Sequence, residues 1–208
     1  MINKTHKTGF TADEKKIYQQ FFDSLKIPTK KLKSPIYICL FGKIGAGKST
    51  VAKKIAKKIP LVIIRSDTVR YLFISFYKKK KIINKRVKKI YYRTIRELLS
   101  KNHSLIIDAG NQSLDDINRH KEITNNFKAS LVWLNIFCPE KTILKRFKNK
   151  KSDFNTIKKG NLSNKYIYSQ RKFLYLKNLK KINPIYKINT AKPLDPQINE
   201  SLELIQKK

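Results

Sequence analysis

Residues 36–52 read IYICLFGKIGAGKSTVA, and this stretch decides the fold of the chain. The apolar run Ile36–Phe41 predicts a strand buried inside a parallel sheet, and the residues from Val51 onward have the apolar spacing of a helix. Residues 42–49 lie between them and match the pattern G-x-x-x-x-G-K-[ST]. Backbone N–H groups of such a loop point at a phosphate, and the following helix adds the positive end of its dipole. The stretch therefore predicts a nucleoside triphosphate site.

Each part of this loop has an expected role in binding ATP. Lys48 would reach the β- and γ-phosphates, and the Ser49 hydroxyl would bind Mg²⁺. A Gly-rich turn that matches by chance is the alternative, but it would not require a buried strand before it and a helix after it. We predict that the nucleotide is bound by Gly42, Lys43, Ile44, Gly45, Ala46, Gly47, Lys48, Ser49 and Thr50.

Length and composition indicate a globular protein without a membrane segment. The chain has 208 residues, of which 40% are hydrophobic, enough for one core. It contains neither a signal-peptide pattern nor an uncharged apolar run long enough to span a membrane, so we expect a soluble, cytoplasmic protein. Cys39 and Cys138 each lie in or beside an apolar run, which predicts buried thiols rather than a disulfide or a metal site.

The charge balance is extreme. The chain has 48 Lys and Arg residues but only 14 Asp and Glu, which gives a formal net charge of +34. A field of this size concentrates polyanions at the surface, so single-stranded or end-exposed nucleic acid is a candidate partner. An AT-rich coding bias is the alternative source of the lysines, although it would also enrich the acidic residues, which are scarce here.

The pattern of apolar runs predicts an alternating α/β chain. Further strands are expected at 61–64, 104–107, 131–137 and 184–188, with helical periods between them. Strands that alternate with helices form parallel sheets covered on both faces. We therefore predict a P-loop NTPase fold with a five-stranded parallel sheet, helices on both faces and a basic lid.

The two ends of the chain have helical patterns of their own. Residues 1–35 form a polar lead-in, in which Thr11 and Glu14 have the spacing of a capping box at the start of a helix. Residues 36–208 would form the catalytic domain. Near the C-terminus, Asp195 and Pro196 suit the cap and the first position of a last helix.

Four segments together carry a resemblance to a known family. They are FGKIGAGKST at 41–50, SDTVR at 66–70, IIDAGN at 106–111 and CPEKTILKRFKNK at 138–150. In order and spacing the chain resembles the P-loop kinases of the polynucleotide kinase, zeta toxin and chloramphenicol phosphotransferase group. The resemblance runs from residue 36 to residue 189 and implies phosphoryl transfer from ATP to a hydroxyl.

The resemblance also implies roles for residues that follow the second and third strands. Asp67 matches the residue that accepts the proton of the acceptor hydroxyl, and Arg70 matches the residue that holds the acceptor. Asp67 as a simple helix cap is the alternative. Asp108 matches the carboxylate that orients Mg²⁺. Asn111 matches a substrate-binding Asn, although Gly110 stands where the family has Thr.

The resemblance extends to a lid that closes over the phosphates. Arg146 and Lys150 match its R-x-x-x-R pattern, with Lys at the second position. Lysine can neutralise charge but cannot make the bidentate contact of arginine, so either activity is reduced or Arg146 carries the lid function alone. A solvated basic loop is the alternative.

The basic charge favours a nucleic acid among the possible acceptors. Basic residues beside aromatic ones suit a single-stranded polynucleotide, so we expect a polynucleotide 5′-hydroxyl kinase. One alternative is a small-molecule kinase that acts on an antibiotic, a sugar nucleotide or another alcohol. Another is a nucleic-acid-binding protein regulated by ATP, without kinase activity. The residues that favour nucleic acid are Lys78, Lys79, Lys80, Lys81, Lys85, Arg86, Lys88, Lys89, Lys158, Lys159, Tyr166 and Tyr168.

Overall fold

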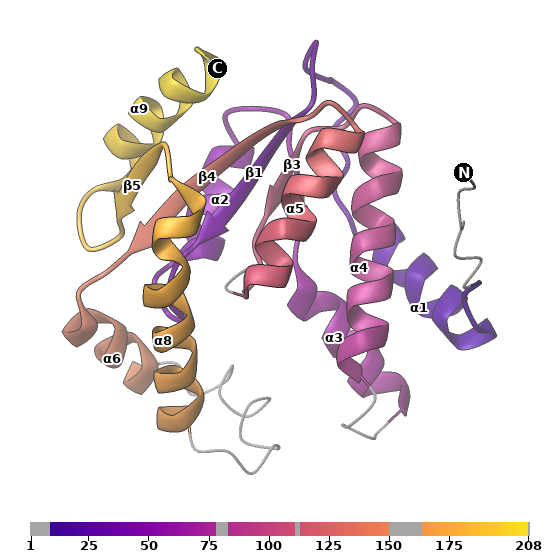
Figure 1. Cartoon of the computed structure of the whole chain (residues 1–208), viewed down its shortest axis with the longest axis horizontal. Coiled ribbons are helices and arrows are strands. Elements are labelled where there is room, and N and C mark those ends of the chain that lie inside the picture. The colour runs from indigo at the N-terminus through magenta and orange to yellow at the C-terminus, as the bar shows by residue number, and fades with distance from the viewer. Residues whose placement is uncertain (1–8, 78–82, 111–112, 150–163, 208) are drawn as a thin grey trace.

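The computed structural model describes residues 9–77, 83–110, 113–149 and 164–207. Its centre is a sheet of five parallel strands in the order β2-β3-β1-β4-β5 (Figure 1). The predicted parallel sheet is thereby confirmed. The strands are β1 (Ile36–Phe41), β2 (Val62–Ile64), β3 (Leu105–Ile107), β4 (Ser130–Phe137) and β5 (Tyr186–Asn189).

Helices cover both faces of this sheet, as predicted. Side chains of β1 point alternately to the two faces, so Ile38 and Leu40 pack on one side while Cys39 and Phe41 pack on the other. The first side is covered by α2 (Lys48–Ala56) and α9 (Leu194–Gln206). The second is covered by α1 (Ala12–Asp23), α3 (Ser66–Tyr77), α4 (Ile83–Ser100), α5 (Leu114–Asn126) and α8 (Asn164–Ile182). The short helix α6 (Glu140–Asn149) follows β4.

The N-terminal helix α1 contributes to the core. Thr11 caps α1, and its side chain and that of Glu14 form the predicted capping box. Ile17 and Phe21 are buried in the same cluster as the side chains of β1. The helix of the lead-in thus packs on the domain that follows it, and the proposed division at residue 36 stays a prediction.

Two sequence expectations near the C-terminus are wrong in detail. Strand β5 begins at Tyr186, two residues later than predicted, although the Ile185 N–H already donates to the Trp133 carbonyl oxygen of β4 at 3.0 Å. Helix α9 has Pro193 as its N-cap, so Asp195 is not the cap. Asp195 instead lies in the first turn of α9, and its carboxylate forms an ion pair with Lys54 of α2 at 2.7 Å. The carboxylate therefore connects two helices on one face.

The predicted burial of the two cysteines is confirmed, since the Cys39 and Cys138 side chains are both buried. Burial raises the pKa of the Cys39 thiol well above its usual value. Within the described ranges, no helix has the length and apolar composition needed to cross a membrane.

All five strands run in the same direction, so their carboxyl ends meet at one edge of the sheet. The loop after β1, Arg65 after β2, Asp108 after β3 and Thr190 after β5 all lie at this edge. Ligands of open α/β sheets bind outside the carboxyl ends of the strands. The topology therefore brings the predicted nucleotide and acceptor residues together.

Candidate active site

The loop between β1 and α2 has the backbone shape of a phosphate cradle. Gly45 and Gly47 have φ values of +76° and +94°, which side chains with a Cβ rarely adopt. At Gly42 an added Cβ would lie 2.1 Å from the carbonyl oxygen of Ile136, so β4 leaves room only for glycine. Gly47 is the N-cap of α2, whose positive dipole end therefore faces the loop.

Lys48 is the first residue of α2, and its side chain turns back over the loop. Its Nζ donates hydrogen bonds to the carbonyl oxygens of Gly42, at 2.9 Å, and Lys43, at 3.0 Å. The ammonium group thus already lies against the loop that would hold the phosphates. The structure brings the whole predicted set together in this loop and the first turn of α2: Gly42, Lys43, Ile44, Gly45, Ala46, Gly47, Lys48, Ser49 and Thr50.

Arg146 of α6 and Thr190 after β5 hold the other side of the loop. Arg146 donates from Nη1 to the Gly45 carbonyl oxygen at 3.2 Å and to the Thr190 hydroxyl at 3.0 Å, and from Nη2 to the Thr190 carbonyl oxygen at 2.8 Å. The Thr190 hydroxyl in turn donates to the Ala46 carbonyl oxygen at 2.7 Å. The predicted lid cation is therefore fixed beside the phosphate loop, and Lys150 lies outside the described residues.

Thr190 was not identified from the sequence. Its signal is its position, because a polar residue within two positions of the end of a predicted strand lies at the same sheet edge as Asp67 and Asp108. The same rule would have drawn attention to Arg65, which follows β2.

Asp108 lies directly after β3 and is 7% exposed. Its backbone N–H donates to the Ile64 carbonyl oxygen at 2.9 Å, and its carboxylate pairs with Arg65 at 3.2 Å. The buried carboxylate is thus held by an arginine from the neighbouring strand end. Because β3 pairs with β1, this carboxylate lies at the end of the strand beside β1, which leads into the phosphate loop.

The donor set suits Mg²⁺ bound together with phosphate oxygens. Among the described side chains, no group of three or more His, Cys, Asp or Glu residues is placed to hold a metal. Ser49 and Asp108 offer oxygen ligands at the sheet edge, and Mg²⁺ usually keeps waters and substrate phosphates as its remaining ligands. The two predicted metal ligands therefore fit Mg²⁺ that arrives with a nucleotide.

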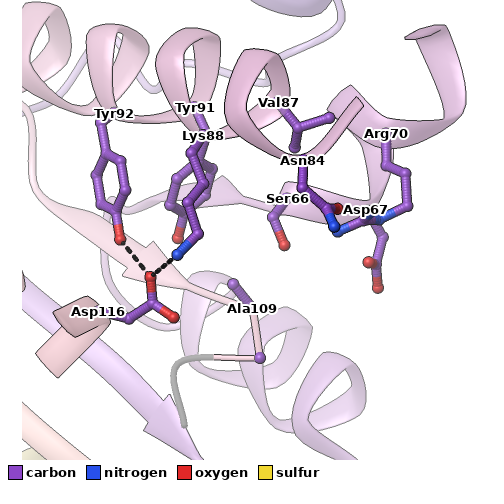
Figure 2. Close-up of a pocket in the computed structure, with 11 residues that line it drawn as sticks. Ser66, Asp67, Arg70, Asn84, Val87, Lys88, Tyr91, Tyr92, Ala109 and Asp116 are labelled. Carbon is purple, nitrogen blue, oxygen red and sulfur yellow. Dashed lines mark hydrogen bonds and ion pairs between the residues drawn. The ribbon is translucent and has the colours of Figure 1, made fainter. Parts of the chain in front are cut away.

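A cavity of about 440 Å³ opens beside this edge, and we call it the acceptor cavity (Figure 2). Asp67, the predicted base, and Arg70, the predicted substrate-binding residue, both line it. Since α3 begins at Ser66, Asp67 lies inside the first turn rather than before it. Other lining residues come from α3, α4, α5 and the end of β3: Ser66, Asn84, Val87, Lys88, Tyr91, Tyr92, Ala109, Gly110 and Asp116.

Asp116 organises one wall of the acceptor cavity and was not identified from the sequence. It accepts hydrogen bonds from Lys88, at 2.7 Å, and Tyr92, at 3.0 Å, which Figure 2 shows as two converging contacts. Burial alone would raise the pKa of Asp116, but hydrogen bonds from Lys88 and Ser113 outweigh it and lower the pKa. The carboxylate therefore stays ionised. On the opposite wall, Arg70 donates to the side-chain oxygen of Asn84 at 2.5 Å.

Several predicted functional residues fall outside the part of the chain that the structure describes. Asn111, expected to bind substrate, is one of them, and so are the basic residues Lys78, Lys79, Lys80, Lys81, Lys158 and Lys159. The side chains of Tyr166 and Tyr168 are also outside it. Their roles stay predictions.

A family model described as "AAA domain" matches residues 38–162, which is more than half of the chain. The chain belongs to the AAA domain family. The matched part of this AAA domain contains the phosphate loop, Asp67, Asp108 and Arg146. No curated protein sequence matches the chain.

Solved structures share the fold of this AAA domain. A protein of the PezAT chromosomal toxin–antitoxin system of Streptococcus pneumoniae has a TM-score of 0.63 at 17% identity, over 90% of this chain and 81% of that one. APS kinase CysC of Mycobacterium tuberculosis, in complex with AMPPNP and APS, has 0.54 at 13%, over 83% and 98%. Shikimate kinase of Bacteroides thetaiotaomicron has 0.52 at 16%, over 83% and 97%. At these identities the similarity shows a common fold, the α/β P-loop NTPase fold.

Proposed function

We propose that this AAA domain transfers the γ-phosphoryl group of ATP to a hydroxyl of an acceptor bound in the acceptor cavity. One observation carries the proposal. The phosphate loop with Lys48 and the cavity with Asp67 open at the same edge of one parallel sheet. A donor phosphate and an acceptor hydroxyl can therefore meet there. Structures of similar fold include a kinase in complex with AMPPNP, which supports ATP as the donor.

In the proposed reaction, the Asp67 carboxylate takes the proton of the acceptor hydroxyl. The oxygen then forms a bond to the γ-phosphorus, and the bond from that phosphorus to the bridging oxygen breaks, so that ADP leaves with the electron pair. Lys48 would neutralise charge that develops on the phosphates. The Arg146 guanidinium, which donates to the Gly45 carbonyl oxygen, would assist it, and Lys150 would complete the lid.

Mg²⁺ bound with the nucleotide would neutralise phosphate charge and orient the reacting groups. Ser49 and Asp108 are its proposed protein ligands. Arg65 holds the Asp108 carboxylate in place at the sheet edge. In this proposal, Arg70 and Asn111 bind the acceptor.

A polynucleotide with a free 5′-hydroxyl is the acceptor we propose first, because the net charge of +34 favours a polyanion. A small alcohol is the second candidate. The acceptor cavity, at about 440 Å³, has the size range of small-ligand sites. Shikimate kinase and APS kinase have a similar fold, which supports a small acceptor as the second candidate.

Labelled ATP and a panel of acceptors test this function. The panel contains 5′-hydroxyl oligonucleotides, nucleosides, sugar nucleotides and antibiotic alcohols. We expect the wild type to label one class of acceptor and Asp67→Asn to lose about 10²- to 10⁴-fold in rate while it still binds ATP, because the amide cannot accept a proton. Asp23→Asn, on an exposed position of α1, is the matched control and should label normally. Unchanged turnover in Asp67→Asn would refute the assignment of the base.

A further inference from the structure

A second hollow, of about 780 Å³, lies beside the acceptor cavity and is lined mostly by α4 and α5. We call it the basic groove. It shares Lys88, Tyr92 and Asp116 with the acceptor cavity, so the two lie side by side. Its lining holds twice as many cationic as anionic side chains: Lys85, Arg86, Lys88, Lys89, Arg96 and Arg119 against Glu14, Asp115 and Asp116.

The cations of the basic groove fall into two groups. Arg86 and Lys89 pair with Glu14, and Lys88 pairs with Asp116, all at 2.7–2.9 Å. These three are held by the protein's own carboxylates.

The other three are Lys85, Arg96 and Arg119, and none of them forms an ion pair with a carboxylate of the described residues. Arg119 lies over the ring of Tyr92, with its guanidinium carbon 5.1 Å from the ring centroid. Glu14 neutralises only one of its two cations, and Asp115 balances the other, so the surplus positive charge of the groove equals the charge of these three side chains.

The spacing of this charge indicates a chain of phosphates rather than one phosphate. Lys85 and Arg96 lie on the same helix, and eleven residues of α-helix rise about 16 Å. A single phosphate group cannot contact both. A polyanion that leaves the acceptor cavity and follows the groove can.

An exposed aromatic ring beside Asp67 favours nucleic acid among the polyanions. Tyr71 is 62% exposed and lies four residues after Asp67, on the same face of α3. Bases of single strands stack on such rings, whereas inorganic polyphosphate has no group that can.

We propose that the basic groove binds the phosphodiester backbone of a single-stranded polynucleotide, whose 5′-hydroxyl end lies in the acceptor cavity. The proposal rests on the kinase function proposed above and names its acceptor. Lys85, Arg96 and Arg119 contact successive phosphates, and Tyr71 stacks on the base nearest the reacting hydroxyl.

A binding experiment tests the groove without requiring turnover. The probe is a ten-nucleotide single strand with a free 5′-hydroxyl and a 3′ fluorophore, titrated by fluorescence anisotropy between 50 and 300 mM NaCl. The groove variant is Lys85→Gln/Arg96→Gln/Arg119→Gln. The control, Lys57→Gln/Arg93→Gln/Lys187→Gln, removes the same charge at exposed positions outside the groove lining. Thermal unfolding checks that both variants are folded.

We expect wild-type affinity to fall steeply with salt and the log–log slope to become shallower by about 2 in the groove variant, since each single-strand phosphate contact contributes about 0.7. The control should keep the wild-type slope. Equal slopes in the groove and control variants would overturn the proposal, as would a wild type that does not bind the strand. In either case phosphorylation of a small alcohol would leave the kinase function intact.

A second arm separates nucleic acid from other polyanions. Tyr71→Ala should weaken binding of the strand about tenfold, because a stacked base is lost, and should leave binding of inorganic polyphosphate unchanged. Tyr71→Phe keeps the ring and should behave as the wild type. Equal losses for both probes would overturn the role of Tyr71 in base stacking and, with it, the choice of nucleic acid.

Discussion

At the scale of single residues, the charged groups of the site are held by the protein's own polar groups. Lys48 donates to two carbonyl oxygens of its own loop, and Asp108 pairs with Arg65. A phosphate oxygen that enters the loop would replace these carbonyls as the partner of the Lys48 ammonium. The cation is thus placed before the nucleotide binds, and little reorganisation remains for the reaction itself.

Lys48→Ala should therefore abolish phosphoryl transfer, with a loss of at least about 10²-fold in rate, because a charge aimed at the phosphates is removed. Its side chain packs on the loop rather than in the core, so we expect the thermal midpoint to stay close to that of the wild type. Turnover assays with labelled ATP and differential scanning calorimetry check the two parts. Lys53→Ala, exposed on the same helix, is the control and should keep full activity. Near-normal turnover in a folded Lys48→Ala protein would contradict the role of this loop.

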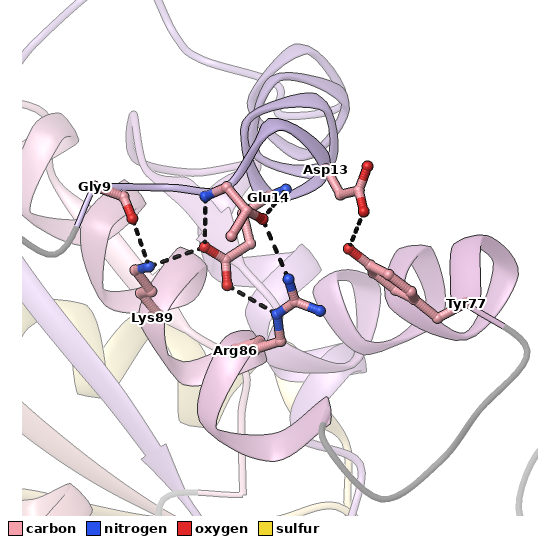
Figure 3. Close-up of polar contacts among 7 residues, drawn as sticks. Gly9, Asp13, Glu14, Tyr77, Arg86 and Lys89 are labelled. Atoms are coloured by element: carbon pink, nitrogen blue, oxygen red, sulfur yellow. Dashed lines mark hydrogen bonds and ion pairs between the residues drawn. The ribbon is translucent and has the colours of Figure 1, made fainter.

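At the scale of elements, α1 holds α3 and α4 in place through polar contacts that surround Glu14 (Figure 3). The Glu14 carboxylate accepts from Arg86 and Lys89 of α4, both at 2.9 Å, and from the backbone of Thr11 at 3.0 Å. The Tyr77 hydroxyl at the end of α3 donates to Asp13 at 2.6 Å. Both α3 and α4 line the acceptor cavity. The N-terminal helix therefore supports the cavity without lining it.

Glu14→Gln tests this contact, because glutamine keeps the capping box but loses the charge. Glu14 is 3% exposed, and we expect a loss of about 2 kcal/mol in unfolding free energy at pH 7. Burial raises the pKa of Glu14, but hydrogen bonds from Lys89 and Arg86 outweigh it and lower the pKa. A carboxylate with a lowered pKa stabilises the fold above its unfolded pKa of about 4.3, and this contribution is lost as pH falls through the folded value.

Urea denaturation at pH 7 and at pH 3.5 measures both effects. The difference between wild type and Glu14→Gln should shrink at the lower pH. Glu203→Gln, exposed on α9, is the control and should match the wild type at both pH values. A difference that is the same at both pH values would show that lost packing, not charge, destabilises the variant.

Elements were predictable from the sequence where one local signal decides them. The apolar run of β1 has the predicted bounds, and the capping box places the start of α1 correctly. The N-cap of α9 was wrong because Asp195 has the local chemistry of a cap, whereas its carboxylate instead pairs with Lys54 of another helix. Local propensity could not reveal that contact, which joins residues 141 positions apart.

At the scale of the whole molecule, the sheet and the phosphate loop followed from the strand–loop–helix pattern, but much of the site wall did not. The pairs Arg65–Asp108 and Arg146–Thr190 join strand ends and helices that are distant in sequence. The Lys88–Asp116 wall depends on how α4 and α5 pack. Such contacts arise from the tertiary arrangement, so sequence periodicity contains no signal for them.

The net charge of +34 is a property of the whole molecule and should govern how its stability responds to salt. Repulsion among the positive side chains acts over about 30 Å at 0.01 M salt but only about 10 Å at 0.1 M. Exposed ion pairs such as Lys54–Asp195 contribute little to stability, so their screening matters less. We therefore expect the thermal midpoint to rise between 0.02 and 0.3 M NaCl, by about 2–4 °C for each 1 kcal/mol of repulsion that is screened. Calorimetry at pH 7 measures the shift. The Lys57→Gln/Arg93→Gln/Lys187→Gln variant has three fewer positive charges, so its thermal midpoint should rise less. A midpoint that falls as salt is added would contradict the prediction, because it would mean that ion pairs outweigh the repulsion.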